Sequence, residues 1–217
     1  MQPTSLDGVP LYYKGPRPEV AAFVPRDAGR ILDVGCGAGV FGQTLRLERG
    51  AEVWGIEMNP DMEPHAAARL DKVLIGDCRL LMPTLEAASF DAVVFADVLE
   101  HLAEPAATLR DAARLLAPGG CVVASLPNLR YWEALAHIVW EGDFRYREEG
   151  IFDRTHLRFF TKKSIPRLFE EADFSVVSLQ GVNANYGRKL KLLNLLTGNR
   201  FEDSKYWQFV VVAKPKG

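Results

Sequence analysis

RILDVGCGAGVFG, residues 30–42, joins a short apolar run to a glycine-rich turn. The run Arg30–Val34 does not alternate with polar residues, a pattern typical of a strand that is buried on both faces. After the turn, the apolar residues of Val40–Arg49 recur at helical spacing, and Gly50 is suited to end that helix. The stretch therefore predicts a strand, a glycine-rich turn and a helix in succession.

The same alternation continues along the chain. A helix is expected over Glu104–Leu116, and Pro118-Gly119-Gly120 reads as a turn into the next strand. Strands that alternate with helices run parallel and are joined by right-handed crossovers. We therefore expect an α/β fold with a doubly wound sheet. Its further strands are expected at Glu52–Ile56, Lys72–Ile75, Phe90–Phe95 and Cys121–Leu126.

The second part of the chain is less regular. A helix is expected over Ser164–Ala172, and two more strands at Phe174–Leu179 and Trp207–Ala213. Between them lie irregular segments at about residues 127–160 and 181–205, which are too long for simple connections and are expected to cover a site. With no internal repeat or linker, we expect one domain over residues 1–217.

Composition excludes several classes of protein. The net charge of -2 gives no global basic field, so a nucleic-acid partner is not expected. Cys36, Cys78 and Cys121 are too far apart to suggest a zinc site or a disulfide framework, and no metal site is expected. No apolar run approaches the length of a bilayer span and no signal peptide is recognisable, so we expect a cytoplasmic protein without stable membrane insertion.

The glycine-rich turn allows two classes of nucleotide-like ligand. Gly37, Gly39 and Gly42 satisfy the dinucleotide pattern GxGxxG. However, Asp33 directly precedes the glycines, where a carboxylate would repel a pyrophosphate and attract an ammonium group. Glu57 follows about 20 residues after the first glycines, where an acid can accept hydrogen bonds from both ribose hydroxyls of either ligand class.

Further motifs follow in order and carry a family resemblance. They are Gly76-Asp77-Cys78, Ala96-Asp97-Val98-Leu99-Glu100-His101-Leu102 and Leu115-Leu116-Ala117-Pro118-Gly119-Gly120. With the glycine-rich turn, they make the chain similar, from about Tyr12 to Leu126, to the class I S-adenosylmethionine-dependent methyltransferases. The resemblance implies a Rossmann-like sheet of seven strands, mostly parallel with an antiparallel last strand and helices on both faces. It also implies S-adenosyl-L-methionine as cofactor.

The resemblance assigns roles to individual residues. Gly35 and Gly37 would lie against the methionine moiety, Glu57 would hold the ribose, and Asp77 would face the adenine. Tyr13 and Arg17 would contact the methionine carboxylate, and Met58 and Cys78 would line the adenine slot. The expected cofactor site thus comprises Tyr13, Arg17, Asp33, Gly35, Cys36, Gly37, Glu57, Met58, Asp77, Cys78, Ala96 and Asp97.

Two histidines are candidates for the chemistry, because a hydroxyl acceptor must lose a proton. His101 follows the fourth strand. It could act as a general base or could have a structural or positioning role. His156 lies with Asp153, Arg154 and Arg158 between aromatic residues, which indicates either a bound polar group or a buried network. The three charged residues are candidates to bind an anionic or sugar-like acceptor. This segment loosely resembles one in methyltransferases of bacterial surface-polysaccharide and natural-product pathways.

The leading hypothesis is a methyltransferase that acts on oxygen or nitrogen of a small molecule. A nicotinamide oxidoreductase is disfavoured by Asp33 and by the lack of a recognisable Tyr-x-x-x-Lys pair. A methyltransferase for protein or RNA, and a cofactor-binding regulator without catalysis, are alternatives that the sequence leaves open. It also leaves open the acceptor, the methylated atom and the oligomeric state.

Overall fold

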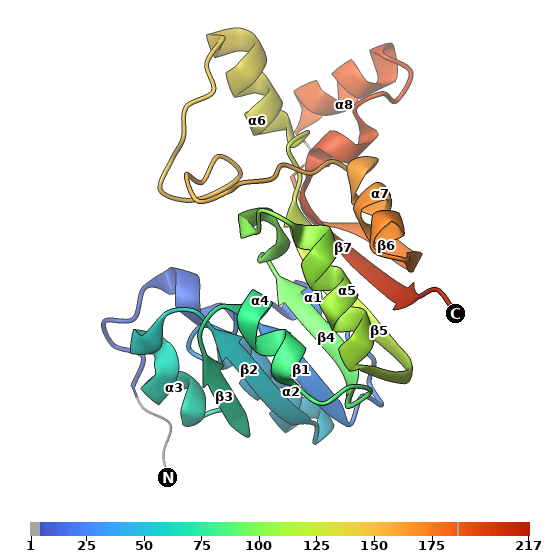
Figure 1. Ribbon diagram of the computed structural model, residues 1–217. Coiled ribbons are helices and arrows are strands. Elements are labelled where there is room, and N and C mark those ends of the chain that lie inside the picture. Colours follow the sequence, from blue (N-terminus) through green and yellow to red (C-terminus); the bar gives the residue numbers. More distant parts are fainter. Residues whose placement is uncertain (1–4, 186) are drawn as a thin grey trace.

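A seven-stranded sheet forms the centre of the computed structural model, which describes residues 5–185 and 187–217 (Figure 1). The strand order is β3-β2-β1-β4-β5-β7-β6. Neighbouring strands from β3 to β5 pair in parallel, whereas β7 is antiparallel to both β5 and β6. This confirms the expected sheet. The strands are β1 (Arg30–Val34), β2 (Glu52–Glu57), β3 (Lys72–Ile75), β4 (Phe90–Ala96), β5 (Leu116–Pro127), β6 (Phe174–Ala184) and β7 (Tyr206–Pro215).

Helices cover the sheet and form most of the connections between its strands. The α-helices are α1 (Pro18–Ala21), α2 (Val40–Arg49), α3 (Glu63–Ala67), α4 (Cys78–Leu81), α5 (Pro105–Leu115), α6 (Trp132–Ala136), α7 (Ser164–Glu171) and α8 (Arg188–Leu196). Short 3-10 helices are η1 (Leu11–Lys14), η2 (Pro60–Met62), η3 (Met82–Thr84), η4 (Leu99–His101) and η6 (Glu202–Lys205), and η5 (His137–Glu141) is a π-helix. As predicted, α2 ends at Gly50, which adopts the left-handed conformation.

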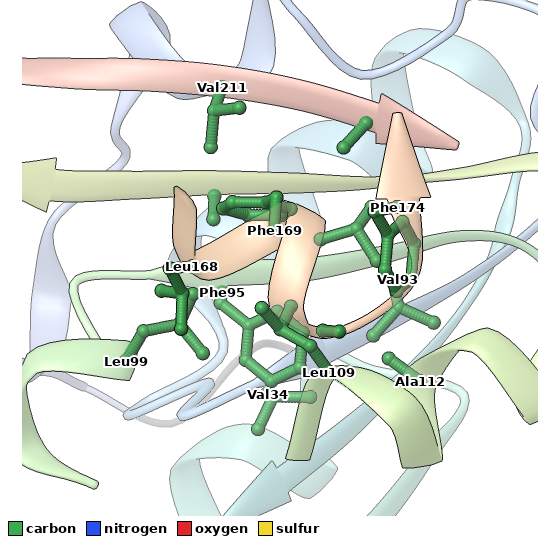
Figure 2. Close-up of a cluster of buried hydrophobic side chains, with 14 of the residues drawn as sticks. Val34, Val93, Phe95, Leu99, Leu109, Ala112, Leu168, Phe169, Phe174 and Val211 are labelled. Carbon is green, nitrogen blue, oxygen red and sulfur yellow. The ribbon is translucent and has the colours of Figure 1, made fainter. Parts of the chain in front are cut away.

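Alternate residues of each central strand feed two separate hydrophobic cores. In β4, Val93 and Phe95 join the core beneath α4, α5 and α7, whereas Ala92 and Val94 join the core beneath α1, α2 and α3. Figure 2 shows part of the first core, with Phe95 near Leu109 of α5. Burial on both faces explains why these strands are continuously apolar rather than alternating.

Two strands differ in extent from the prediction. The structure places Pro118-Gly119-Gly120 inside β5, where the register with β4 shifts between Phe90 and Ala92. Gly119 has a positive φ of 86° and Pro118 has no N–H, so the predicted turn is an irregularity within the strand. The strand β6 continues beyond the predicted end at Leu179 to Ala184, because its pairing with β7 supplies backbone hydrogen bonds. The polar residues at this end of β6 do not indicate a strand.

The irregular segments gather beyond one end of the sheet, where Figure 1 shows α6, α8 and the long loop after α6. Asn128 links them to the sheet, since its side-chain amide donates to the carbonyls of Asp203 and Tyr206, each at 2.9 Å. Within residues 5–185 and 187–217, no helix has both the length and the apolar character to cross a membrane.

Candidate functional site

A cavity of about 880 Å³ opens at the carboxyl ends of β1, β2 and β4. The chain switches there between the two halves of the sheet, which is where open α/β sheets bind ligands. The cavity brings together the whole expected cofactor set and one of the two candidate histidines. These lining residues are Tyr13, Arg17, Asp33, Gly35, Cys36, Gly37, Glu57, Met58, Asp77, Cys78, Ala96, Asp97 and His101.

The glycine-rich turn between β1 and α2 packs closely against the segment that precedes β1. Gly37 has a φ of 54°, and a Cβ added there would lie 2.7 Å from the carbonyl oxygen of Tyr13. The same oxygen accepts a 2.8 Å hydrogen bond from the N–H of Ala38. The position therefore requires glycine for both its conformation and its space. Gly39 serves packing, since its Cβ would meet Ala66 at 3.1 Å.

Glu57 ends β2 with a buried carboxylate held by the backbone. Its Oε2 accepts from the N–H of Gly37 and its Oε1 from the N–H of Asn59, both at 2.8 Å. These bonds fix the carboxylate at the floor of the cavity. A carboxylate oxygen has two acceptor sites, so both oxygens can still accept a hydroxyl from a ligand.

Asp33 is a buried carboxylate with an unsatisfied oxygen. Only 1% of the residue is exposed, and its Oδ2 has no hydrogen-bond partner among the described residues. Burial, followed by the nearby charge of Glu57, raises the pKa of Asp33 to about 7, against the opposing influence of Arg17. An unsatisfied acid in this position favours a cationic ligand.

Arg17 and Asp97 are the centre of a polar network beside Asp33. Nη1 of Arg17 donates to Oδ2 of Asp97 and its Nε donates to Glu19, both at 2.7 Å. The hydroxyl of Ser125 donates to Oδ1 of Asp97 at 2.6 Å. Burial lowers the pKa of the Arg17 guanidinium, but Asp97 and Glu19 together raise it above its ordinary value. Arg17 is therefore held as a cation at the cavity wall.

The expected adenine residues lie at the carboxyl ends of β2 and β3. The Asp77 carboxylate caps α4 by accepting from the N–H of Arg79 at 2.9 Å, and it also binds the Arg79 guanidinium. These hydrogen bonds lower the pKa of Asp77. Cys78 is buried, which raises its thiol pKa to about 11, whereas Met58 is 67% exposed at the cavity edge.

The two candidate histidines lie side by side, with ring centroids 4.7 Å apart. His101 lines the cavity and His156 is buried behind it. Burial, followed by the neighbouring His156, lowers the pKa of His101.

Glu100 completes this cluster and is a residue that sequence reasoning did not single out. It is 1% exposed, and neither carboxylate oxygen has a hydrogen-bond partner in the described part of the chain. Its Oε1 lies 4.0 Å from Nε2 of His156, and burial raises its pKa well above the ordinary value. The sequence shows Glu100 beside His101, but only the fold shows that it is buried.

The charged residues proposed from the sequence to bind an acceptor lie elsewhere. Asp153 is buried and accepts from the hydroxyl of Thr155 at 2.6 Å. Arg154 pairs with Glu148 at 2.5 Å, and Nη2 of Arg158 donates to the carbonyl of Ala103 at 2.6 Å. None of the three is among the described residues that line the cavity. Residue spacing in the sequence could not show which side chains of residues 153–158 face the cavity. These residues belong to no helix or strand that would fix their side-chain directions.

Comparisons with known proteins agree on one family. A family model described as "Methyltransferase domain" matches residues 12–179. A curated relative from Vibrio parahaemolyticus, named ubiquinone biosynthesis O-methyltransferase, is 30% identical over 164 residues, which cover 72% of this chain and 68% of the relative. A relative of the same name from Aeromonas salmonicida is 32% identical over 161 residues, with coverages of 71% and 66%.

A solved structure shares the fold. It is an S-adenosylmethionine-dependent methyltransferase from Thermotoga maritima, described as a possible histamine N-methyltransferase. Its TM-score is 0.64 at 20% identity, with 91% of this chain and 86% of that chain covered. The match extends the likeness beyond the region that the sequence relatives cover.

Proposed function

Since this chain belongs to the methyltransferase domain family and is an S-adenosylmethionine-dependent methyltransferase, we propose that it methylates a hydroxyl oxygen of a small acceptor. Support for oxygen comes from relatives of about 30% identity that are named O-methyltransferases. The observation that carries the proposal is a titratable cluster at one end of the cavity, where His101 lines the wall in front of the buried Glu100 and His156.

The residues of the cavity fit S-adenosylmethionine, which when bound supplies a methyl group on a positively charged sulfur. The unsatisfied carboxylate of Asp33 attracts the ammonium group of the methionine moiety. Glycine at position 37 keeps the turn close to Tyr13, because a Cβ there would collide with the carbonyl oxygen of Tyr13. Glu57 accepts the ribose hydroxyls with its remaining lone pairs.

Further contacts to the cofactor are proposed at both ends of the cavity. Tyr13 and Arg17 lie at the methionine end, where the guanidinium binds a carboxylate. Asp77 accepts from the adenine amino group with an oxygen that it shares with Arg79. Cys36, Met58, Cys78, Ala96 and Asp97 complete the lining of the proposed cofactor site.

The acceptor is proposed to bind where the irregular segment meets the cavity. Glu149, Thr155 and Leu157 come from the loop that follows η5, and they line the cavity together with His101 and Leu102. This part of segment 127–160 covers the acceptor. His101, with Glu100 and His156 behind it, promotes loss of the hydroxyl proton. When bound, the cofactor would supply the methyl carbon to the acceptor oxygen, and the electron pair of the broken carbon–sulfur bond would stay on sulfur.

Arg154 and Arg158 are proposed to act at the rim rather than inside the cavity, in contact with an anionic part of the acceptor. Both side chains are exposed, and their present partners, Glu148 and Glu104, are exposed as well. The variants Arg154→Glu and Arg158→Glu test this role. A KM that is unchanged for an anionic acceptor would remove both residues from the site.

The test of the proposed function is transfer of a labelled methyl group from S-adenosylmethionine to a panel of catechol, phenol, aniline and benzoate. We expect products only from the hydroxyl compounds. His101→Gln should lower kcat while the Kd for S-adenosylhomocysteine stays unchanged, and His137→Gln, which lies outside the cavity lining, is the control. Methylation of the amine with none of the hydroxyls would reject the proposal.

A further inference from the structure

Glu100, His101 and His156 bring three metal-ligating side chains together at the acceptor end of the cavity. One ligand atom from each residue lies within 4.8 Å of the other two. Glu100 and His156 are buried, whereas His101 lines the cavity wall. We propose that these residues bind a divalent transition-metal ion such as Zn²⁺, with an open position toward the acceptor.

The Glu100 carboxylate is buried without a compensating hydrogen bond among the described residues. A buried carboxylate is costly unless a cation or hydrogen-bond donors compensate it. Glu100 is 1% exposed, and both of its oxygens lack a hydrogen-bond partner among residues 5–185 and 187–217. Nε2 of His156 lies 4.0 Å from Oε1 of Glu100, which is beyond hydrogen-bond length. A cation between Oε1 of Glu100 and Nε2 of His156 would give both atoms a binding partner.

Backbone carbonyl groups orient the two imidazoles. Nδ1 of His156 lies 3.1 Å from the carbonyl oxygen of Ile151, and Nδ1 of His101 lies 3.3 Å from that of Thr155. A carbonyl oxygen only accepts, so each Nδ1 carries the proton in its hydrogen bond. In a neutral imidazole this leaves the lone pair on Nε2. Metal-binding histidines are held in this way, with the second nitrogen donating to a carbonyl or carboxylate.

Thr155 and Asp153 hold the imidazole of His101 in place. Oγ1 of Thr155 lies 3.0 Å from Nδ1 of His101 and donates its own proton to Oδ1 of Asp153 at 2.6 Å. The N–H of Thr155 donates to the same carboxylate oxygen at 2.7 Å. Asp153 thus orients His101 through Thr155, which gives this buried acid a positioning role.

The ligand set favours a particular kind of ion. Two imidazole nitrogens and one carboxylate oxygen suit zinc, iron or cobalt, whereas magnesium and calcium prefer oxygen ligands alone. Three protein ligands leave a position open for a further oxygen, as in catalytic zinc sites. Ligand atoms around zinc lie roughly 3.4 Å apart, for metal–ligand bonds of about 2.1 Å. Ion binding therefore requires the separation of 4.0 Å between His156 and Glu100 to shorten, and likewise the other ligand separations, which are within 4.8 Å.

This inference rests on the proposed function for its chemistry. A divalent cation lowers the pKa of a hydroxyl that it binds, so the acceptor can lose its proton to water near neutral pH. Binding of the ion itself does not depend on methyl transfer.

The test is calorimetric titration of chelator-treated protein with Zn²⁺, without acceptor, followed by titration with Co²⁺ in visible absorption. We expect one ion per chain and a visible band typical of nitrogen and oxygen ligands. Glu100→Gln and His156→Gln should weaken binding at least about 10-fold, and Thr155→Val by about 10- to 100-fold. The matched control is His137→Gln, because His137 pairs with Glu141 at 2.7 Å away from the cavity lining.

The proposed ion site would be overturned if the wild type binds no ion in a one-to-one ratio. It would also be overturned if Glu100→Gln, His156→Gln and Thr155→Val bind the ion with the affinity of the wild type. Circular dichroism and binding of S-adenosylhomocysteine show that each variant is folded. If the ion binds as expected but no hydroxyl is methylated, the ion site stands and the hydroxyl acceptor is rejected. If hydroxyl methylation continues unchanged in chelator and no ion binds, the acceptor stands and the ion site is rejected.

Discussion

Arg17 and Asp97 form an ion pair of 2.7 Å at the cavity wall, although they are 80 residues apart in the sequence. Both residues adopt the left-handed backbone conformation, with φ values of 45° and 57°. Such conformations are uncommon for residues other than glycine and persist where surrounding contacts hold them. The pair fixes the segment before β1 onto the end of β4 and shapes the proposed methionine end of the cavity.

Arg17→Ala should therefore weaken both cofactor binding and folding. Loss of the guanidinium leaves the Asp97 carboxylate without its cation, which for this partly exposed pair costs about 2 kcal/mol of stability. The Kd for S-adenosylhomocysteine should rise about 10-fold or more. Urea unfolding and calorimetric titration measure the two effects. The control is Arg46→Ala, which breaks a 3.0 Å pair with Asp71 outside the cavity lining and should leave the Kd unchanged. An equal loss of affinity in both variants would contradict a local role for Arg17.

Glu57→Gln should raise the Kd for S-adenosylhomocysteine by about 10- to 100-fold. Hydrogen bonds to a charged acceptor contribute about 1.5–3 kcal/mol, and the amide retains only one accepting oxygen. Glu52→Gln is the control, because Glu52 begins the same strand and its exposed side chain pairs with Arg30 at the opposite end. If the two variants bind alike, Glu57 does not hold the ribose.

The sequence predicted which residues at the edge of the sheet line the cavity, for a physical reason. Asp33 and Glu57 lie at the carboxyl ends of β1 and β2, and Asp77 and Asp97 follow β3 and β4. Parallel strands bring their carboxyl ends to one edge of the sheet. The order of motifs therefore predicts which side chains gather there, without knowledge of the loops. The same logic placed His101 after β4.

The side of the cavity that is proposed to bind the acceptor could not be predicted in this way. Arg154 and Arg158 lie in a segment without strand or helix periodicity, and the structure turns their side chains to exposed partners. The burial of Glu100 depends on residues that lie 57 and 58 positions later, since the N–H groups of Leu157 and Arg158 donate to its carbonyl oxygen. Contacts of such long range leave no pattern in the local sequence.

Asp33 should make stability depend on pH. Its pKa is about 7 in the folded chain against an ordinary value of 3.8, so the folded state binds more protons between these values. The contribution of Asp33 to stability is therefore fully present below pH 3.8 and is lost as the pH rises through 7. The loss is on the order of 4 kcal/mol. Asp33→Asn should lack this slope, so that it gains stability over the wild type from pH 5 to pH 8 in urea unfolding. Parallel curves for the two proteins would contradict the raised pKa.

Cofactor binding should release a proton from Asp33 below pH 7. An ammonium group beside the carboxylate favours its ionised form, so binding and ionisation are coupled. At pH 6.5, calorimetry with S-adenosylhomocysteine in buffers of different ionisation enthalpy should show proton release in the wild type and none in Asp33→Asn. Equal release in both proteins would assign the proton to another group.

Gly37→Ala and Gly50→Ala separate conformational strain from the shape of the cavity. Both glycines have positive φ values, 54° and 68°, so each alanine costs about 1 kcal/mol of backbone strain. At Gly50 a new Cβ meets nothing within 4 Å, whereas at Gly37 it lies 2.7 Å from the carbonyl oxygen of Tyr13. Both variants should lose stability in thermal unfolding, but only Gly37→Ala should displace Tyr13 and the amide that binds Glu57. We therefore expect at least a 10-fold rise in the Kd for S-adenosylhomocysteine in Gly37→Ala and wild-type affinity in Gly50→Ala. Wild-type affinity in both would show that the turn tolerates a side chain where the cofactor is proposed to bind.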